Sequence, residues 1–165
     1  MLGAVFGDIV GSAYEWHNVK TNDFPLERPK THFTDDSVMT LAVAEWLMED
    51  REHSEEELVR CMQKLGRSHF TAGYGSKFIN WLISPNPKPY GSWGNGSAMR
   101  VSPVGLYAST LEETLELAEI TANVTHNHPE GVKGAKAVAE CVFICKEAES
   151  LEAAKEEIRR RIPEK

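Results

Sequence analysis

Apolar residues recur every three or four positions over most of the chain, which is the spacing of one face of an α-helix. The alternation of apolar and polar residues that marks a half-buried strand is nearly absent. Helical faces are marked by Leu58, Met62, Leu65 and His69, by Leu115, Ala118 and Ala122, and by Val132, Ala135, Ala139, Val142 and Ile144. The pattern therefore predicts an all-α protein.

The starts of two of these helices carry capping boxes, in which a hydroxyl and a glutamate satisfy free backbone N–H groups of the first turn. The boxes are formed by Ser54 with Glu57 and by Thr110 with Glu113. Residues 150–161 predict a last, polar amphipathic helix anchored by Leu151 and Ile158.

Residues 38–48 are apolar almost all round, which in a water-soluble protein indicates a helix buried on most sides at the centre of a bundle. Residues 18–33 and 85–96 contain prolines or glycines without sustained periodicity and predict loops. We therefore expect a compact orthogonal helical bundle.

The length of 165 residues, without repeats or linkers, predicts one domain over residues 1–165. The formal charge of -7 disfavours a nucleic-acid partner, because such binding depends on neutralising phosphates with basic side chains. No membrane span or basic signal region stands out in the sequence, so we expect a cytoplasmic protein that does not bind membranes.

The three cysteines are an odd number and have no zinc-binding spacing. We interpret Cys61, Cys141 and Cys145 as reduced thiols. Cys141 and Cys145 lie four positions apart on one predicted helix, so they are expected to share a face and fill the core.

Thr34, Asp35 and Asp36 directly precede the apolar run. One interpretation is helix capping, because threonine and aspartate are good N-caps and negative charge is favoured at a helix N-terminus. One residue is enough for a cap, however, and two adjacent carboxylates with a hydroxyl are hard oxygen donors that suit Mg²⁺ or Mn²⁺. A metal site is the second interpretation.

The N-terminal segment is an apolar helix interrupted by Gly3, Gly7 and Gly11. Glycine at spacing four is explained by close packing against another backbone. Asp8 and Glu15 are seven positions apart, which places both on one helical face, and we expect them to face the proposed metal.

Two glycine-rich stretches, residues 73–76 and 91–100, run into helix starts. Small residues there present free backbone N–H groups to an anion, as phosphate sites do, although the same residues also form ordinary turns. Neither stretch has the ending of a P-loop.

A histidine-containing stretch, residues 125–131, precedes the third predicted helix. His126 and His128 lack the HExxH spacing of a zinc site. The stretch is interpreted either as an N-cap region or as the lining of a pocket for a base or ribose.

Five stretches together, GDIVGSAYE, TDDSVMTLAVAEWL, GYGSKF, WGNGSAMRVSPVG and THNHPEGVKGA, resemble the ADP-ribosylglycohydrolase family in content and order. The resemblance covers residues 1 to 145 or so. It implies an all-α fold with two Mg²⁺ or Mn²⁺ ions, and a hydrolase that cleaves the glycosidic bond of an ADP-ribosylated protein or small-molecule ADP-ribose derivative and releases ADP-ribose.

The resemblance also implies roles for individual residues. Thr34, Asp35 and Asp36 would be metal ligands, and Glu15, Asp35 and Asp36 would form the catalytic centre around a metal-bound water and the distal ribose. The diphosphate and riboses would contact Gly73, Tyr74, Gly75, Asn95, Gly96, Ser97 and Met99, and His126 would lie near the adenosine.

One family feature is missing. Members of the family are longer and carry a second metal motif, D-x-D-[ST], near their C-terminal end, and no such motif follows Asp36 here. The chain is thus expected to be a short or truncated member with an incomplete second metal site, or to be completed by another chain. An apolar face left uncovered would favour a homo-oligomer.

Three hypotheses follow. The first is a metal-dependent hydrolase with low activity as an isolated chain, because part of the metal site is lacking. The second is a module that binds ADP-ribose without cleaving it. The third is a helical interaction protein that recognises neither nucleotide nor metal.

Overall fold

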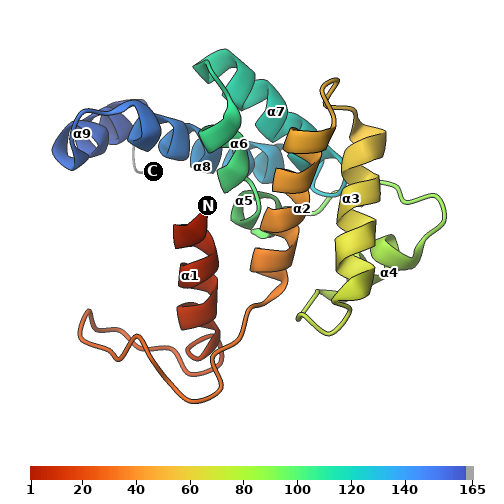
Figure 1. The fold of residues 1–165 in the computed structure, drawn as a ribbon, viewed down its shortest axis with the longest axis horizontal. Helices are drawn as coiled ribbons and strands as arrows, with labels where there is room; N and C mark the ends of the chain where they lie inside the picture. The colour runs from red at the N-terminus through yellow and green to blue at the C-terminus, as the bar shows by residue number, and fades with distance from the viewer. Residues whose placement is uncertain (163–165) are drawn as a thin grey trace.

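The structure is a computed structural model that describes residues 1–162. Its regular elements over these residues are helices, without a strand, which confirms the all-α prediction (Figure 1). The helices are α1 (Leu2–Ser12), α2 (Asp35–Glu49), α3 (Glu55–Ser68), α4 (Ser76–Ile83), α5 (Gly96–Met99), α6 (Ser102–Tyr107), α7 (Leu111–Asn123), α8 (Pro129–Glu147) and α9 (Leu151–Arg161). None of these described helices is long and apolar enough to cross a bilayer.

Helix α2 is the central element, and α1, α3, α5 and α6 all pack against it. Its Met39, Ala42 and Val43 side chains are fully buried in the main hydrophobic cluster. Leu41 and Met48 are exposed, so one side of α2 faces outward. The predicted burial of this helix is therefore confirmed on most of its sides.

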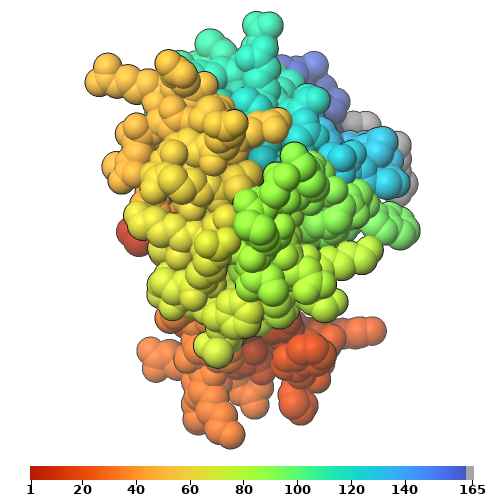
Figure 2. Space-filling view, turned by 90° about the vertical axis from the view of Figure 1, so that its right-hand side faces the viewer, coloured from red at the N-terminus to blue at the C-terminus, as the bar shows by residue number. Residues whose placement is uncertain are grey.

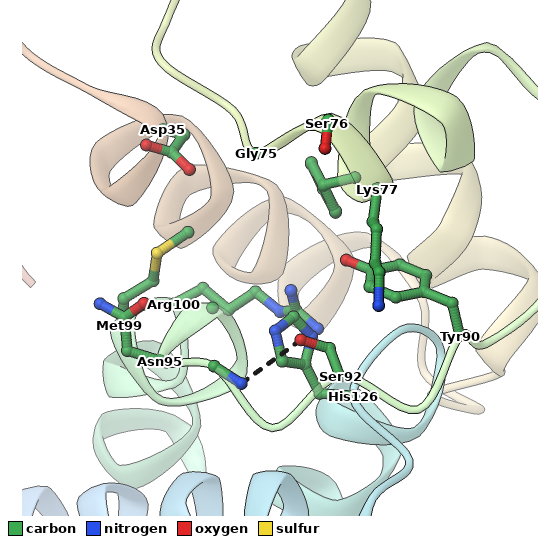
Figure 3. A pocket seen from close by; sticks show the side chains of 13 residues that line it. Asp35, Gly75, Ser76, Lys77, Tyr90, Ser92, Asn95, Met99, Arg100 and His126 are labelled. Carbon is green, nitrogen blue, oxygen red and sulfur yellow. Dashed lines mark hydrogen bonds between the residues drawn. The ribbon is translucent and has the colours of Figure 1, made fainter.

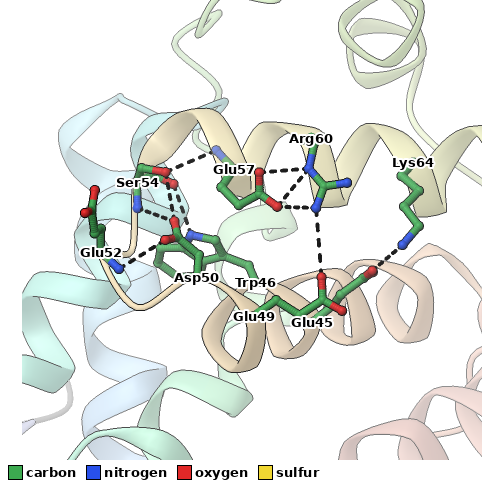
Figure 4. A network of polar contacts seen from close by, with 9 residues as sticks. All are labelled: Glu45, Trp46, Glu49, Asp50, Glu52, Ser54, Glu57, Arg60 and Lys64. Atoms are coloured by element: carbon green, nitrogen blue, oxygen red, sulfur yellow. Dashed lines mark hydrogen bonds and ion pairs between the residues drawn. The ribbon is translucent and has the colours of Figure 1, made fainter.

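A network of polar contacts joins the end of α2 to the start of α3 (Figure 4). The Asp50 carboxylate accepts hydrogen bonds from the backbone N–H of Ser54 at 2.7 Å and from its hydroxyl at 2.8 Å. The indole N–H of Trp46 donates to the carbonyl of Ser54 at 3.0 Å, and Lys64 forms an ion pair with Glu45. These contacts fix the angle at which α3 leaves α2.

The two predicted capping residues begin their helices as expected. Ser54 accepts a hydrogen bond from the backbone N–H of Glu57, and Thr110 accepts one from Glu113. The hydroxyl half of each predicted box is confirmed. The glutamate half is not, because the Glu57 carboxylate pairs with Arg60 and the Glu113 carboxylate accepts from the backbone N–H of Ser109 and not of Thr110.

The C-terminal part of the described chain is built on α8, against which α5, α6, α7 and α9 pack. Helix α6 approaches α8 most closely at Gly105. A Cβ atom there would lie 2.5 Å from the carbonyl oxygen of Ala139 and 2.7 Å from the Cβ of Val142. Glycine at this position is thus required by the packing of α6 on α8.

Helix α1 packs beside α2 at the edge of the molecule, and none of its residues is fully buried (Figure 1). A Cβ atom added to Gly3, Gly7 or Gly11 would meet nothing within 4 Å. The prediction that these glycines allow close packing is therefore wrong for the described part of the chain. Leu2 and Phe6 on the same helix are exposed.

Residues 13–34 connect α1 to α2 without a helix and form a lobe beside the rest of the molecule, coloured red to orange in Figure 2. The loop predicted for residues 18–33 is confirmed. Tyr14 organises the lobe: its ring contacts Phe24 edge to face, and its hydroxyl donates to the carbonyl of Pro25 at 2.5 Å.

Two predictions about buried side chains need correction. Cys61 is buried, but Cys141 is half-buried and Cys145 is exposed, so the cysteine pair on α8 does not fill the core. In α9, Leu151 is exposed and Ala154 is the buried residue. Ile158, the other predicted anchor, is half-buried, and α9 packs against α8.

Helix starts are predicted at the two glycine-rich stretches, but the sequence pattern does not define α4, α5 and α6 as separate helices. They have 8, 4 and 6 residues, too few for the helical repeat to recur clearly. Each also lacks a side-chain cap.

Candidate functional site

The site is built on the N-terminus of α2. Thr34 is its N-cap: the Thr34 hydroxyl accepts a hydrogen bond from the backbone N–H of Asp36 at 3.2 Å. The capping interpretation of this triplet is therefore confirmed for Thr34. The carboxylates of Asp35 and Asp36 are the candidate metal ligands that are not needed for this cap.

Asp8 of α1 makes a second cap on the same helix. Its carboxylate accepts from the backbone N–H of Thr34 at 2.8 Å and of Ser37 at 3.1 Å. It also accepts from the hydroxyls of Thr34 at 2.6 Å and Ser37 at 2.5 Å. These contacts fix α1 to the start of α2. Asp8 also lines the cavity that contains Glu15 and Asp36, and its position facing a metal stays a prediction.

Asp35 and Asp36 are half-buried and lie within a cluster of negative charge. Burial, followed by the charge of Asp36, raises the pKa of Asp35 to about 6. Burial and the charge of Asp8 raise the pKa of Asp36 as well, and Glu15 adds to both. The protein thus supplies little that compensates these two carboxylates.

Glu15 lies beyond the end of α1, so the expectation that it shares a helical face with Asp8 is wrong. A cavity of about 350 Å³ nevertheless brings both residues together with Thr34, Asp36 and Asn95. Glu15 therefore remains beside the acidic start of α2, placed there by the turn that follows α1.

The oxygen atoms of this region have the right chemistry to bind a divalent cation, but too few metal-binding side chains are brought together. Two half-buried carboxylates whose pKa values are raised by burial and by neighbouring negative charge would be stabilised by a cation between or beside them. However, no group of three or more His, Cys, Asp or Glu side chains in residues 1–162 is arranged to hold a metal ion. The described residues supply part of a coordination shell.

A second cavity, of about 380 Å³, opens on the other side of Asp35 (Figure 3). Figure 3 shows the N-terminus of α4 on one side of this cavity and the α5 segment with His126 on the other. Asn95 lines this cavity and the acidic one, which indicates that the two adjoin. Of the residues predicted to bind substrate, the cavity is lined by Gly75, Asn95, Gly96, Met99 and His126.

The loop before α4 brings its glycines against the start of α2. The backbone N–H of Asp35 donates to the carbonyl of Ala72 at 2.8 Å. Gly73 adopts φ +104°, and a Cβ atom there would lie 3.6 Å from a carboxylate oxygen of Asp35. This backbone conformation favours glycine, and it holds the loop close to the acidic residue.

Three predicted substrate-binding residues do not line this cavity: Gly73, described above, Tyr74 and Ser97. Tyr74 is buried in the core beside Phe78, with ring centroids 5.3 Å apart, and does not line the cavity. Ser97 is buried, and its hydroxyl donates to the carbonyl of Gly131 at 2.8 Å, which joins α5 to α8. Tyr74 and Ser97 are both buried in the core and do not line the cavity.

The cavity is also lined by residues without an individually predicted role. Ser76, Ser92, Gly94 and Arg100 lie within the two predicted glycine-rich stretches, whereas Lys77, Phe78 and Tyr90 lie outside them. The available signals were Lys77, which follows a glycine and a serine at a helix start, and Arg100, a charge between apolar neighbours.

The fold and site define an all-α protein in which an acidic helix start adjoins a glycine-lined cavity. Residues 1–165 match the family model described as ADP-ribosylglycohydrolase, and the chain belongs to this family.

Relatives include ADP-ribosylhydrolase ARH3 of Mus musculus, 28% identical over 82% of this chain and 45% of the relative. ADP-ribosylhydrolase ARH3 of Homo sapiens is 25% identical over 91% of this chain and 50% of its own length. The protein of the same name from Xenopus tropicalis is 26% identical over 82% of this chain and 46% of the relative. The chain thus spans about half the length of the curated relatives it matches.

Replacement of Asp8 by alanine tests its capping role. The variant leaves two backbone N–H groups at the start of α2 without their acceptor, and we expect it to lose about 2 kcal/mol of unfolding free energy. Thermal denaturation measures this loss, and amide hydrogen exchange should show faster exchange at Ser37 with little change in α8. Asp23→Ala, in the exposed loop, is the matched control. An Asp8→Ala variant as stable as the control would contradict the role.

Replacement of Asp35 by asparagine tests the charge cluster. A carboxyl group whose pKa rises from 3.8 to about 6 on folding contributes stability below pH 3.8 that is lost as the pH rises through 6. Asparagine cannot ionise, so Asp35→Asn should gain stability relative to wild type between pH 4 and pH 7.5 in buffer with a chelator. After discounting for solvent screening we expect about 1 kcal/mol, or about 3 °C in melting temperature.

Asp23→Asn is the control for this measurement and should show no such pH-dependent gain. An equal difference between Asp35→Asn and wild type at both pH values would show that Asp35 is not destabilised by its charged neighbours.

Proposed function

We propose that the chain carries the substrate-binding part of a metal-dependent hydrolase that cleaves the glycosidic bond of ADP-ribosylated substrates and releases ADP-ribose. The observation that carries the proposal is the position of the two aspartates at the start of α2. Asp35 lines the larger, glycine-rich cavity, and Asp36 lines the smaller, acidic one. Family membership and the name of the relatives, ADP-ribosylhydrolase, support the same reaction.

The larger of the two cavities suits an anionic nucleotide. Ser76 and Lys77 begin α4, where backbone N–H groups are free and the helix dipole favours negative charge. Lys77 adds a positive charge, and Tyr90 offers an aromatic ring for stacking. We assign the diphosphate to the α4 start and the adenosine to the side of Tyr90 and His126.

The distal ribose would then extend towards Asp35 and Asp36. Mg²⁺ or Mn²⁺ held by these carboxylates, with the hydroxyl of Thr34 at hand, would supply an activated water and stabilise charge on the sugar. Glu15 would accept a proton from that water or hold a ribose hydroxyl. A chain that provides so few ligands should bind metal weakly, which is why we propose low activity for the isolated chain.

A module that binds ADP-ribose without cleaving it is the second candidate. It is favoured by the incomplete set of metal-binding side chains in residues 1–162. Such a module would keep the cavity and use Asp35 and Asp36 for hydrogen bonds to the ribose.

The test separates these candidates. The purified chain is mixed with an ADP-ribosylated peptide and Mg²⁺ or Mn²⁺, and free ADP-ribose is measured by chromatography; calorimetry measures ADP-ribose binding. For the hydrolase we expect slow release that requires the metal and is lost in Asp35→Ala and Asp36→Ala but kept in Asp23→Ala.

Binding without release would favour the module. A chain that shows neither binding nor release would contradict both candidates.

Replacement of Lys77 by methionine tests the assignment of the diphosphate. In calorimetry, Lys77→Met should bind ADP-ribose about tenfold more weakly, which corresponds to the loss of about one charge-assisted contact. Lys88→Met, an exposed lysine outside the cavity lining, should not.

Partners and compartment follow from the same proposal. We place the protein in the cytoplasm, with an ADP-ribosylated protein or small ADP-ribose derivative as its substrate.

Self-association into a homo-oligomer is supported by exposed apolar side chains of α1 and α2. They are Leu2, Phe6, Leu41 and Met48. Light scattering of the purified chain should give a mass above that of one copy, and a monomer at all concentrations would contradict it.

A further inference from the structure

Arg100 is a fully buried charge without an acidic partner in the described residues. One of its terminal nitrogens donates to the carbonyl of Thr121 at 2.6 Å and to the hydroxyl of Thr125 at 2.8 Å. Burial lowers the pKa of Arg100 to about 10, so the guanidinium remains charged at neutral pH. Because arginine has no acceptor atom, it can only donate in both contacts.

The contact with Arg100 determines the direction of the next hydrogen bond. The hydroxyl of Thr125 already accepts from Arg100, and Thr125 is fully buried, so water is not available to its own hydrogen. His126 Nδ1 lies 2.7 Å from that hydroxyl oxygen. A buried hydroxyl hydrogen without an acceptor costs free energy, so Thr125 donates to Nδ1, and Nδ1 carries no hydrogen.

His126 is the last member of this chain of contacts. Burial, together with the charge of Arg100, lowers its pKa to about 4, so the ring is neutral at neutral pH. A neutral imidazole carries one hydrogen. With Nδ1 acting as an acceptor, that hydrogen is on Nε2.

The Nε2 side of the ring is the side at the cavity. A Cβ atom added to Gly96 would lie 2.8 Å from both Nε2 and Cε1 of His126, so the ring edge packs directly on this glycine of the cavity wall. Nε2 makes no hydrogen bond to any described residue, which leaves its N–H for a ligand. Glycine at position 96 is needed for the ring to occupy this place.

We propose that Arg100, acting through Thr125, is a positioning residue that holds His126 in the neutral Nε2–H form, so that the ring presents a fixed hydrogen-bond donor to the cavity. Arg100 is fully buried although it is one of the residues around the cavity, and the role proposed here is exercised through Thr125. The donor suits an oxygen acceptor such as a phosphate, hydroxyl or carbonyl oxygen of the nucleotide, a step that rests on the proposed function. The same protonation state prevents Nε2 from acting as a general base or a metal ligand.

The position of the hydrogen can be measured without any ligand. The chain is labelled with ¹⁵N-histidine, and long-range ¹H–¹⁵N correlation spectra distinguish protonated from unprotonated ring nitrogens. The signals of His126 are assigned from their loss in His126→Gln. We expect one neutral form at neutral pH, with Nδ1 unprotonated and Nε2 protonated. A protonated Nδ1, or a mixture of both forms, in the wild-type chain would overturn the proposal.

Thr125→Val tests the relay, because valine has the shape of threonine without the hydroxyl. We expect a mixture of the two neutral forms in this variant, whereas Thr125→Ser should restore the single form. Arg100→Met, if it folds, should behave like Thr125→Val, because the freed hydroxyl can then turn away from Nδ1. A purely structural role for these residues would change the melting temperature and leave the form of the ring unchanged, and that result would overturn the proposal.

Calorimetry with ADP-ribose adds a functional measurement. Thr125→Val should bind about tenfold more weakly than wild type, and Thr125→Ser nearly as well as wild type. If the wild-type chain does not bind ADP-ribose while the spectra show the single Nε2–H form, the proposed function fails and the role of Arg100 stands. If the chain binds ADP-ribose equally in both Thr125 variants, the donor role of His126 fails.

Discussion

The Asp8 carboxylate holds together the part of the molecule on which the site depends. It connects α1, a helix without a fully buried residue, to the N-terminus of the most buried helix. Because it satisfies the backbone of both Thr34 and Ser37, it also fixes the direction in which Asp35 and Asp36 leave the helix start. This carboxylate thus determines where the acidic pair is placed.

The site as a whole combines opposite charges that are kept apart. Asp35, Asp36 and Glu15 gather at the start of α2, whereas Lys77 and Arg100 lie on the other sides of the larger cavity. A ligand with a polar, hydroxyl-rich end and an anionic middle matches this separation, and an ADP-ribosyl group has both. Arg100 is noteworthy because its charge is buried and meets hydroxyl and carbonyl oxygens in place of a carboxylate.

Much of the fold follows from the sequence pattern, because a long helix with a regular apolar face and a hydroxyl N-cap can be recognised in the sequence. The buried helix after Thr34 and the helices capped by Ser54 and Thr110 are examples. The extent of a short helix such as α4 cannot be predicted in this way, because its eight residues form little more than two turns. Burial within a helix is also hard to predict when the partner is unknown, as the exposure of Cys145 shows.

The candidate site could be predicted as a set of stretches but not as a geometry. Residues of five of them meet around two adjoining cavities, as expected, yet the sequence did not distinguish residues that line a cavity from residues behind it. Tyr74 and Ser97 line neither cavity, whereas the fully buried Arg100 lines the larger one. Such distinctions depend on the rotation of short helices about their axes, which tertiary packing decides.

The position of α1 has one more consequence, for the motions of the molecule. Local opening costs least where few apolar groups are buried, so α1 should detach from the bundle far more often than the whole chain unfolds. Each detachment removes Asp8 from the start of α2 and leaves the acidic pair unsupported. The lifetime of an intact site is then governed by the docking of an edge helix, and any molecule that covers α1 would lengthen it.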